Sequence, residues 1–237
     1  MYDFRIPIYS VMILLALVAN IVVVALISKK YSFTKEEIIC LLLYENVGII
    51  GGAKILTFLQ NYKELNGQFV FLRLGFTAYG AIIGALLFLT FFSLQFKKSL
   101  KELLYIFMPS IPLMYGIGKI GCFLAGCCHG FDYNGLGSVI YNYSKSAPKY
   151  TPLFPIQIIE TIFFIGIFIY MITKHSRNQF VLKTLGVSFV LCGFSKFILD
   201  FFRASHLYEL SLNQIISIVF IVIGLVLIIT KRCKTTP

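Results

Sequence analysis

The sequence has few charged residues and no segment that would divide it into domains. Of its 237 residues only 13% are charged and 58% are hydrophobic, and the mean hydropathy is +0.86. A soluble domain is typically about 25% charged, so this composition excludes a water-soluble globule, a disordered chain and a coiled coil. The chain also has no internal repeat, low-complexity tract or linker. It is therefore predicted to be a single integral-membrane domain over residues 1–237.

A signal-peptide cleavage site and a nucleic-acid-binding patch are also missing. No small-residue cleavage site follows the first apolar run, so we expect this run to be retained as a membrane span. The net charge is +11, but the basic residues form no patch interleaved with exposed aromatics, and we expect no nucleic-acid partner. In a membrane protein, excess lysine and arginine instead mark cytoplasmic loops.

Seven apolar stretches are long enough to cross a bilayer, which takes about 20 helical residues. They cover approximately residues 6–28, 38–59, 69–94, 103–128, 155–173, 185–202 and 212–230. This pattern predicts an all-α membrane protein, a bundle of seven transmembrane helices. The first, third and fifth loops and the C-terminal tail together hold twelve lysines and arginines, against six for the N-terminus and the other loops. The N-terminus is then expected outside and the C-terminus in the cytoplasm.

Ionisable residues occur inside or at the ends of these spans, where each costs roughly 2.5–3.5 kcal/mol near mid-bilayer. They are Glu45, Lys54, Lys119, Glu160, Lys196, Asp200 and Arg203. All except Glu45 fall, with Tyr79 and Gln157, toward the outer end of their spans. We expect them to line a polar cavity in the outer leaflet with a net positive wall, which suits an anionic lipid head group. The alternative is a set of structural ion pairs, such as Lys196 with Asp200, or Glu160 with Lys54 or Lys119.

The most distinctive stretch is GIGKIGCFLAGCCHG over residues 116–130. It resembles the signature of the bacterial prolipoprotein diacylglyceryl transferase family. The matching positions are Gly118, Gly121, Phe123, Gly126 and Gly130. Lys119 stands where the family has arginine, Cys122 where it has asparagine and Cys127 where it has glutamate. The chain therefore resembles a cysteine-rich, divergent branch of the family.

Four further segments resemble this family in the same order along the chain. Residues 75–84 match its histidine-glycine-glycine segment with Tyr79 in the histidine's place, and residues 155–160 match a second motif with Phe154 in place of histidine. Residues 196–203 and 211–217 match the stretches at the last two spans. The resemblance covers about the last three-quarters of the chain.

The resemblance implies a multi-pass enzyme of the bacterial plasma membrane. It would transfer a diacylglyceryl group from phosphatidylglycerol to the cysteine thiol of a lipoprotein precursor. The first candidates for the phosphate site are Lys119 and Arg203. The second candidates are Lys54, Lys196 and Asp200. His129, Tyr79 and Glu160 are candidates for a base or an orienting group, and Gln157 for a donor to the lipid. Two alternatives remain open: a lipid transferase with a different acceptor, and a lipid-binding or transport protein without chemistry.

The cysteines allow more than one interpretation. Most of the six lie in or beside apolar runs, so a disulfide framework of the secreted type is not expected. Cys122 and Cys127 are assigned to substrate binding because they replace motif residues, and Cys128 to packing. A metal site and a reactive thiol are further options, but the spacing lacks the usual paired C-x-x-C form. We therefore predict no metal and no cofactor.

Overall fold

The computed structural model describes residues 8–62, 75–144, 146–179, 181–204 and 211–230, and these are mostly helical. The chain divides into two compact units, Met1–Asn20 with Met108–Pro237, and Ile21–Phe107. We call the first the α5–α8 unit and the second the α2–α4 unit. Helix α1 (Ile8–Ser28) contributes its first part to the α5–α8 unit and the rest to the α2–α4 unit.

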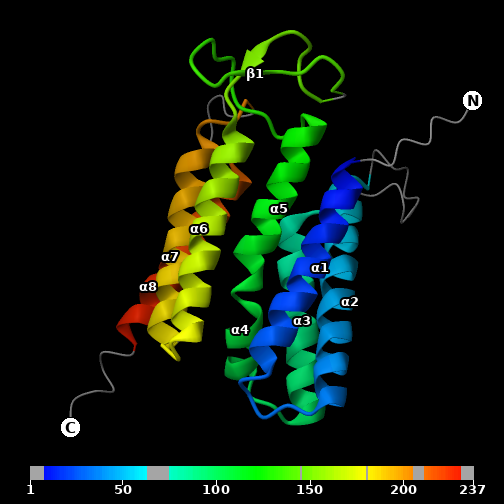
Figure 1. Cartoon of the computed structure of the whole chain (residues 1–237), viewed down its shortest axis with the longest axis vertical. Coiled ribbons are helices and arrows are strands. Elements are labelled where there is room, and N and C mark those ends of the chain that lie inside the picture. The colour runs from blue at the N-terminus through cyan, green and yellow to red at the C-terminus, as the bar shows by residue number, and fades with distance from the viewer. Residues whose placement is uncertain (1–7, 63–74, 145, 180, 205–210, 231–237) are drawn as a thin grey trace, which may run out of the picture. The chain divides into compact units, whose positions relative to one another are not determined.

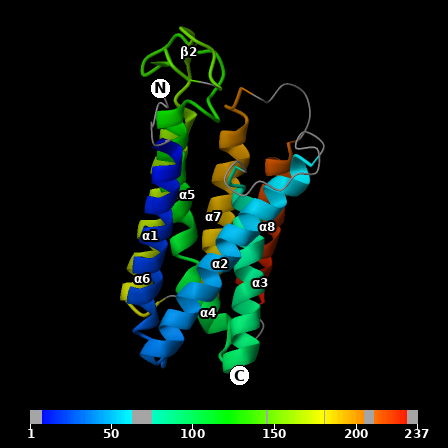
Figure 2. The same cartoon turned by 90° about the vertical axis from the view of Figure 1, so that its right-hand side faces the viewer.

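The α5–α8 unit consists mainly of long apolar helices. They are α5 (Ser110–Ala125), α6 (Ile156–Ser176), α7 (Leu182–Asp200) and α8 (Leu212–Ile229). Helix α6 packs against both α5 and α7, and α7 packs against α8 (Figures 1 and 2). The connection from α5 to α6 contains a short antiparallel pair, β1 (Val139–Ile140) and β2 (Pro152–Leu153), with Val139 opposite Leu153.

The α2–α4 unit is held together by close contact between two helices. Its elements are α2 (Lys35–Gln60), α3 (Ala78–Phe96) and α4 (Leu100–Phe107). Gly48 and Gly52 of α2 meet Gly80 and Gly84 of α3, and a Cβ added at Gly48 would lie 2.5 Å from the Gly84 carbonyl oxygen. Small residues four apart on both helices permit this approach, a common solution in membranes, where van der Waals packing drives helix association.

Six helical segments are long and apolar enough to cross a membrane. They are Ile8–Ser28, Lys35–Gln60, Ala78–Phe96, Leu100–Ala125, Ile156–Ser176 and Leu182–Asp200. A shorter apolar segment, Asn213–Ile229, lies in α8. Large apolar side chains remain exposed on these helices, among them Leu43 at 60% and Ile162 at 66%. Such all-round apolar surfaces are expected where the surrounding solvent is lipid.

Two predicted spans differ in detail from the observed helices. The stretch predicted at 103–128 is interrupted between Phe107 and Ser110, because Pro109 lacks an N–H and disfavours helical backbone at the preceding residue. It ends at Ala125 because Gly126 turns left-handed at φ +73°. The third stretch becomes helical only at Ala78, whereas residues 75–77 were predicted as helix. Residues 69–74 lie outside the described part of the chain.

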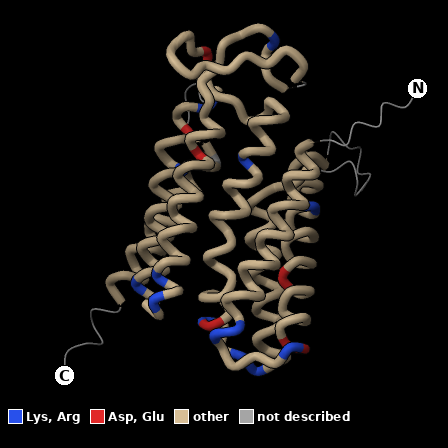
Figure 3. Tube along the Cα trace, viewed as in Figure 1, with Lys and Arg blue, Asp and Glu red and all other residues tan. Residues whose placement is uncertain are grey.

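In the α5–α8 unit, charges lie mainly toward the two ends of the helices (Figure 3). At one end of this unit, the last turn of α6 carries Lys174, the connection to α7 carries Arg177 and the start of α7 carries Lys183. Glu160, in the first turns of α6, and Asp200, the last residue of α7, lie toward the opposite end of the same helices. The two ends of this unit therefore differ in charge, with acidic residues of α6 and α7 at one end only.

Candidate functional site

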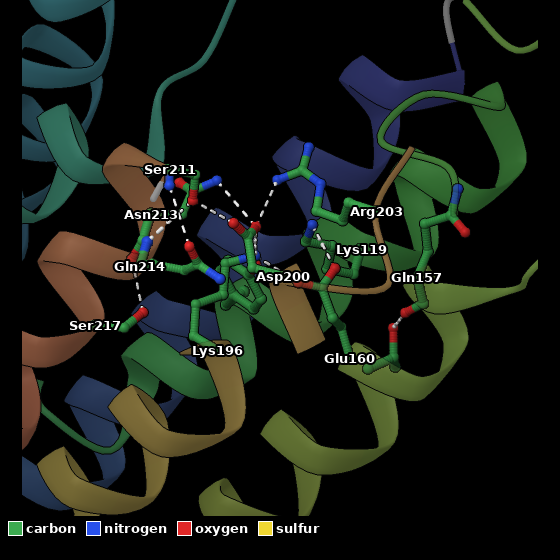
Figure 4. A network of polar contacts seen from close by, with 12 residues as sticks. Lys119, Gln157, Glu160, Lys196, Asp200, Arg203, Ser211, Asn213, Gln214 and Ser217 are labelled. Carbon is green, nitrogen blue, oxygen red and sulfur yellow. Dashed lines mark hydrogen bonds and ion pairs between the residues drawn. The ribbon is translucent and has the colours of Figure 1, made fainter. Parts of the chain in front are cut away.

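Glu160 is the centre of a buried ion-pair cluster formed by three helices. Its Oε2 lies 2.5 Å from Nζ of Lys119 on α5, and its Oε1 lies 2.6 Å from Nζ of Lys196 on α7 (Figure 4). The Glu160 side chain is fully buried, and the two lysine side chains are 8% and 12% exposed. Two ammonium groups on one carboxylate satisfy it in a low-dielectric surrounding, where an isolated charge would be very costly.

Tyr115 completes this part of the cluster and was not among the residues predicted from the sequence. Its hydroxyl donates to Glu160 Oε1 at 3.1 Å. The ammonium groups of Lys119 and Lys196 lie 5.2 and 5.6 Å from the centre of its ring. A ring face within about 6 Å attracts a cation. The signal available in the sequence was its position four residues before Lys119, on the same face of α5.

Asp200 connects the cluster to the start of α8. Its Oδ1 accepts from Asn213 Nδ2 at 3.1 Å and from Arg203 Nη1 at 3.5 Å, and lies 3.8 Å from Lys196 Nζ. Its Oδ2 accepts from the Ser211 hydroxyl. Ser211 also caps α8 together with Gln214, whose side chain accepts from the Ser211 N–H. Asp200 therefore positions both the beginning of α8 and Arg203.

The cluster carries a surplus of positive charge. Lys119, Lys196 and Arg203 face two carboxylates, those of Glu160 and Asp200. Among the residues that the structure describes, no acceptor contacts the buried Nε of Arg203. The guanidinium thus has a donor to offer to an anion, and phosphate is one of the anions that arginine binds with two parallel hydrogen bonds.

The end of α5 brings three cysteines together. The N–H of Cys127 donates to Cys122 O at 3.0 Å and the N–H of Gly126 to Phe123 O at 3.2 Å, a Schellman turn with Gly126 in the left-handed position. Cys128 is also left-handed, at φ +54°. The sulfur atoms of Cys122, Cys127 and Cys128 all lie within 4.8 Å of one another.

Neighbouring groups hold the pKa of the Cys128 thiol below its usual range. Hydrogen bonds from Cys122 and Cys127 lower the pKa of Cys128 most, and the positive charges of Lys119 and Arg203 lower it further, against the opposing effect of burial. The cysteine turn and the ion-pair cluster are thus electrostatically connected parts of the same unit.

The loop after the cysteine turn is fixed by backbone contacts. Gln157, only 1% exposed, donates its amide to Cys127 O at 3.0 Å. Gly130 forms a β-bridge with Arg203, and a Cβ at Gly130 would lie 2.8 Å from that of Phe154. This crowding explains the glycine at 130. The Gln157 amide separately connects the cysteine turn to the start of α6.

The remaining predicted site residues are His129, Lys54 and Tyr79, and Phe154 is of interest because it stands at a motif position. The His129 ring Nδ1 lies 3.0 Å from the Gly130 carbonyl oxygen. Phe154, at the family's histidine position, stacks on Phe131 and Phe202, with ring centres 5.4 and 5.5 Å apart. Lys54 and Tyr79 belong to the α2–α4 unit. Their meeting with Lys119 and Glu160 therefore stays a prediction.

Comparison with known proteins agrees with the resemblance seen in the motifs. The family model for prolipoprotein diacylglyceryl transferase matches residues 1–230. The chain belongs to this family. A phosphatidylglycerol–prolipoprotein diacylglyceryl transferase 2 of Clostridium perfringens is 31% identical over 194 residues, which is 79% of this chain and 75% of that protein. The transferase of Clostridium tetani is 28% identical over 92% of this chain and 90% of its own length. One from Dehalococcoides mccartyi is 33% identical over 73% of this chain and 68% of its own.

Proposed function

We propose that this chain transfers a diacylglyceryl group from phosphatidylglycerol to the cysteine thiol of a lipoprotein precursor, at the outer leaflet of a bacterial plasma membrane. Family membership over residues 1–230 supports the reaction class. Relatives that bear the name of this activity are 28–33% identical over most of the chain. The acceptor is a precursor with a cysteine near its N-terminus, and both substrates meet the enzyme in the bilayer.

The observation that carries this proposal is the buried cluster with one more cation than anion. A phosphodiester head group has one negative charge, which Arg203, Lys119 and Lys196 complement. The same donors stabilise the second negative charge that the leaving glycerol phosphate gains when the carbon–oxygen bond breaks. Lys54 would add to this binding site from the α2–α4 unit.

We assign Glu160 and Asp200 to positioning, since each carboxylate is occupied by cationic and neutral donors of the protein. Glu160 orients the two lysines, and Asp200 orients Arg203. Tyr79 and His129 remain candidates for a base or an orienting group near the acceptor thiol. Gln157 acts through the cysteine turn, where Cys122 and Cys127 occupy positions that face the acceptor.

We also propose seven spans in one integral-membrane domain over residues 1–237, with the N-terminus outside and the C-terminus in the cytoplasm. The seventh span is α8 with its flanking residues. The basic turn between α6 and α7 supports this orientation, because such turns are retained in the cytoplasm. The ion-pair cluster, toward the opposite end of α6 and α7, is then in the outer leaflet.

The test is transfer by the purified protein in vesicles that contain phosphatidylglycerol. A labelled acceptor peptide with one cysteine is expected to gain the diacylglyceryl mass while glycerol phosphate appears in equal amount. A Cys→Ser acceptor peptide is the substrate control. Binding of phosphatidylglycerol without either product would favour a lipid-binding or transport protein. Release of glycerol phosphate without peptide modification would indicate a different acceptor.

The variant that tests the site is Arg203→Ala. It removes the cation with free donors and is expected to lower transfer by at least about 100-fold, the size of the loss of one preorganised charged donor. Arg177→Ala, in the exposed α6–α7 turn, is the matched control and is expected to keep full transfer. Equal activity of both variants would remove Arg203 from the phosphate site.

A further inference from the structure

The three cysteines at the end of α5 are not explained by phosphate binding. Two of them, Cys122 and Cys127, stand where the family signature has asparagine and glutamate, so the change replaces oxygen and nitrogen groups by thiols at the centre of the motif. Thiols are poor partners for a phosphate, which needs hydrogen-bond donors and positive charge. Their grouping therefore requires a separate explanation.

The geometry of the sulfur atoms suits a tetrahedral metal ion. Zinc binds thiolates at about 2.3 Å, so two sulfurs on one zinc are about 3.8 Å apart. The sulfurs of Cys122, Cys127 and Cys128 lie within 4.8 Å of one another, so even the widest pair needs to close by only about 1 Å. The Schellman turn produces this arrangement from neighbours five and six residues apart, and a C-x-x-C spacing is not required.

The surroundings of the turn are ordered as around a metal site. Gln157 donates to the Cys127 carbonyl at 3.0 Å, and the Ser144 hydroxyl donates to the Ala125 carbonyl at 3.1 Å. On another side, a Cβ at Gly121 would lie 2.8 Å from Met12 Cβ, so α1 packs directly against the helix that carries Cys122. Such contacts hold ligands in position before the ion binds.

The ligand set has three members. Among the described histidines, cysteines and acidic residues, no fourth joins the group, and the neighbouring His129 ring lies against the Gly130 carbonyl. Three protein ligands with a fourth position left to substrate is the arrangement of catalytic zinc sites, whereas structural sites are closed by four.

We propose that Cys122, Cys127 and Cys128 bind a zinc ion whose fourth position takes the thiol of the acceptor cysteine. This role rests on the proposed transferase function. A thiol bound to zinc loses its proton, here to water, and stays a thiolate at neutral pH. Its sulfur then forms a bond to the glyceryl carbon that carries the phosphate. The carbon–oxygen bond breaks, its electron pair stays on the phosphate oxygen, glycerol phosphate leaves, and the neutral thioether dissociates from the metal. No electron transfer to or from another reactant is involved.

The first measurement is metal content. The full-length protein, purified in detergent without chelator from cells supplied with zinc, is expected to contain one zinc per chain by mass spectrometry of the metal. Cys122→Ser, Cys127→Ser and Cys128→Ser are each expected to lower zinc at least 10-fold. Cys40→Ser, in the α2–α4 unit, is the matched control and is expected to keep it. Absence of zinc together with free thiols, or a mass 2 Da lower from a disulfide, would overturn the proposal.

The second measurement tests the open position without relying on turnover. The cobalt-substituted protein is expected to show a sulfur-to-cobalt charge-transfer band. This band should intensify when the acceptor peptide is added, and stay unchanged with the Cys→Ser peptide. An unchanged spectrum with both peptides would overturn the thiol-binding role.

Activity separates this proposal from the function on which it rests. Transfer is expected to fall at least 10-fold when zinc is removed, and to return when zinc is added back. Full transfer by zinc-free protein would overturn the metal's role and leave the transferase function in place. A protein that holds zinc, binds the acceptor thiol and yet never transfers lipid would instead contradict the transferase function, while the metal site would stand.

Discussion

Glu160 determines the arrangement of the buried charges. A carboxylate with two ammonium groups at 2.5 and 2.6 Å connects α5, α6 and α7 through one side chain. Removal of the carboxylate would leave Lys119 and Lys196 facing each other in a dry surrounding. The loss of one partner from a buried ion pair costs about 3–5 kcal/mol.

Glu160→Gln is therefore expected to lower the free energy of unfolding by about 3–5 kcal/mol and to abolish transfer. The side chain keeps its shape but loses the charge that holds both lysines. Thermal unfolding in detergent and the transfer assay check this. Glu36→Gln, exposed at the start of α2, is the control and is expected to change neither. An E160Q protein with unchanged stability would mean that the cluster is not maintained by its charges.

For single residues, the sequence predicted which charged residues belong to the ion-pair cluster better than it predicted which of them contact each other. Lys119, Glu160, Lys196, Asp200 and Arg203 were all predicted as site residues, because charges are rare within apolar spans. Helix periodicity places a residue on a face, but not opposite a particular neighbour. For this reason Lys54 and Lys119 were equally acceptable partners of Glu160 from the sequence, and the structure shows the contact of Glu160 with Lys119.

The helix pairs depend on glycine at the places where backbones touch. In α2 and α3, the carbonyl oxygens of Gly48 and Gly80 face glycines of the other helix. In α7 and α8, a Cβ at Gly186 would lie 2.7 Å from Gly224 O, and one at Gly193 would lie 2.6 Å from Ser217 O. Close backbone approach gives these pairs dispersion contacts that larger side chains would prevent.

Gly84→Ala is expected to destabilise the α2–α3 pair by about 1–3 kcal/mol, the usual cost of overpacking. The new methyl group would lie 2.9 Å from the Gly52 Cα and closer still to the Gly48 carbonyl oxygen. The measurement is the midpoint of thermal unfolding. Gly51→Ala is the matched control, because nothing lies within 4 Å of a Cβ at that position, and it is expected to be neutral. Equal midpoints for the Gly84→Ala and Gly51→Ala proteins would show that the close α2–α3 contact does not contribute to stability.

The bounds of the helices were predictable where the apolar stretch begins and ends with the helix. They were less predictable where a single residue breaks or ends the helix within an apolar stretch. The ranges of α1, α2 and α6 follow the apolar stretches within a few residues. The break at Pro109 and the turn at Gly126 occur inside one apolar stretch and depend on single residues. The grouping of the cysteines was not predictable for the same reason, since a helix that ends in a Schellman turn brings residues i and i+5 together.

For the whole molecule, the proposed orientation can be tested directly. A reporter enzyme that is active only outside the cytoplasm is expected to be inactive when fused after residue 230, and active when inserted between β1 and β2 in the loop between α5 and α6. The physical reason is the excess of basic residues in the loops assigned to the cytoplasm. The opposite pattern would place the ion-pair cluster in the inner leaflet and remove the route to an external acceptor.

The order of the helices along the chain has a consequence for biogenesis. Lys119 is synthesised before Glu160, and Glu160 before Lys196. Until α6 emerges from the ribosome, α5 carries an ammonium group with no carboxylate to accompany it into lipid. We therefore expect α5 to wait at the insertion machinery and to enter the bilayer together with α6. In an arrested nascent chain that ends before residue 156, α5 should crosslink to the insertion machinery and not to lipid.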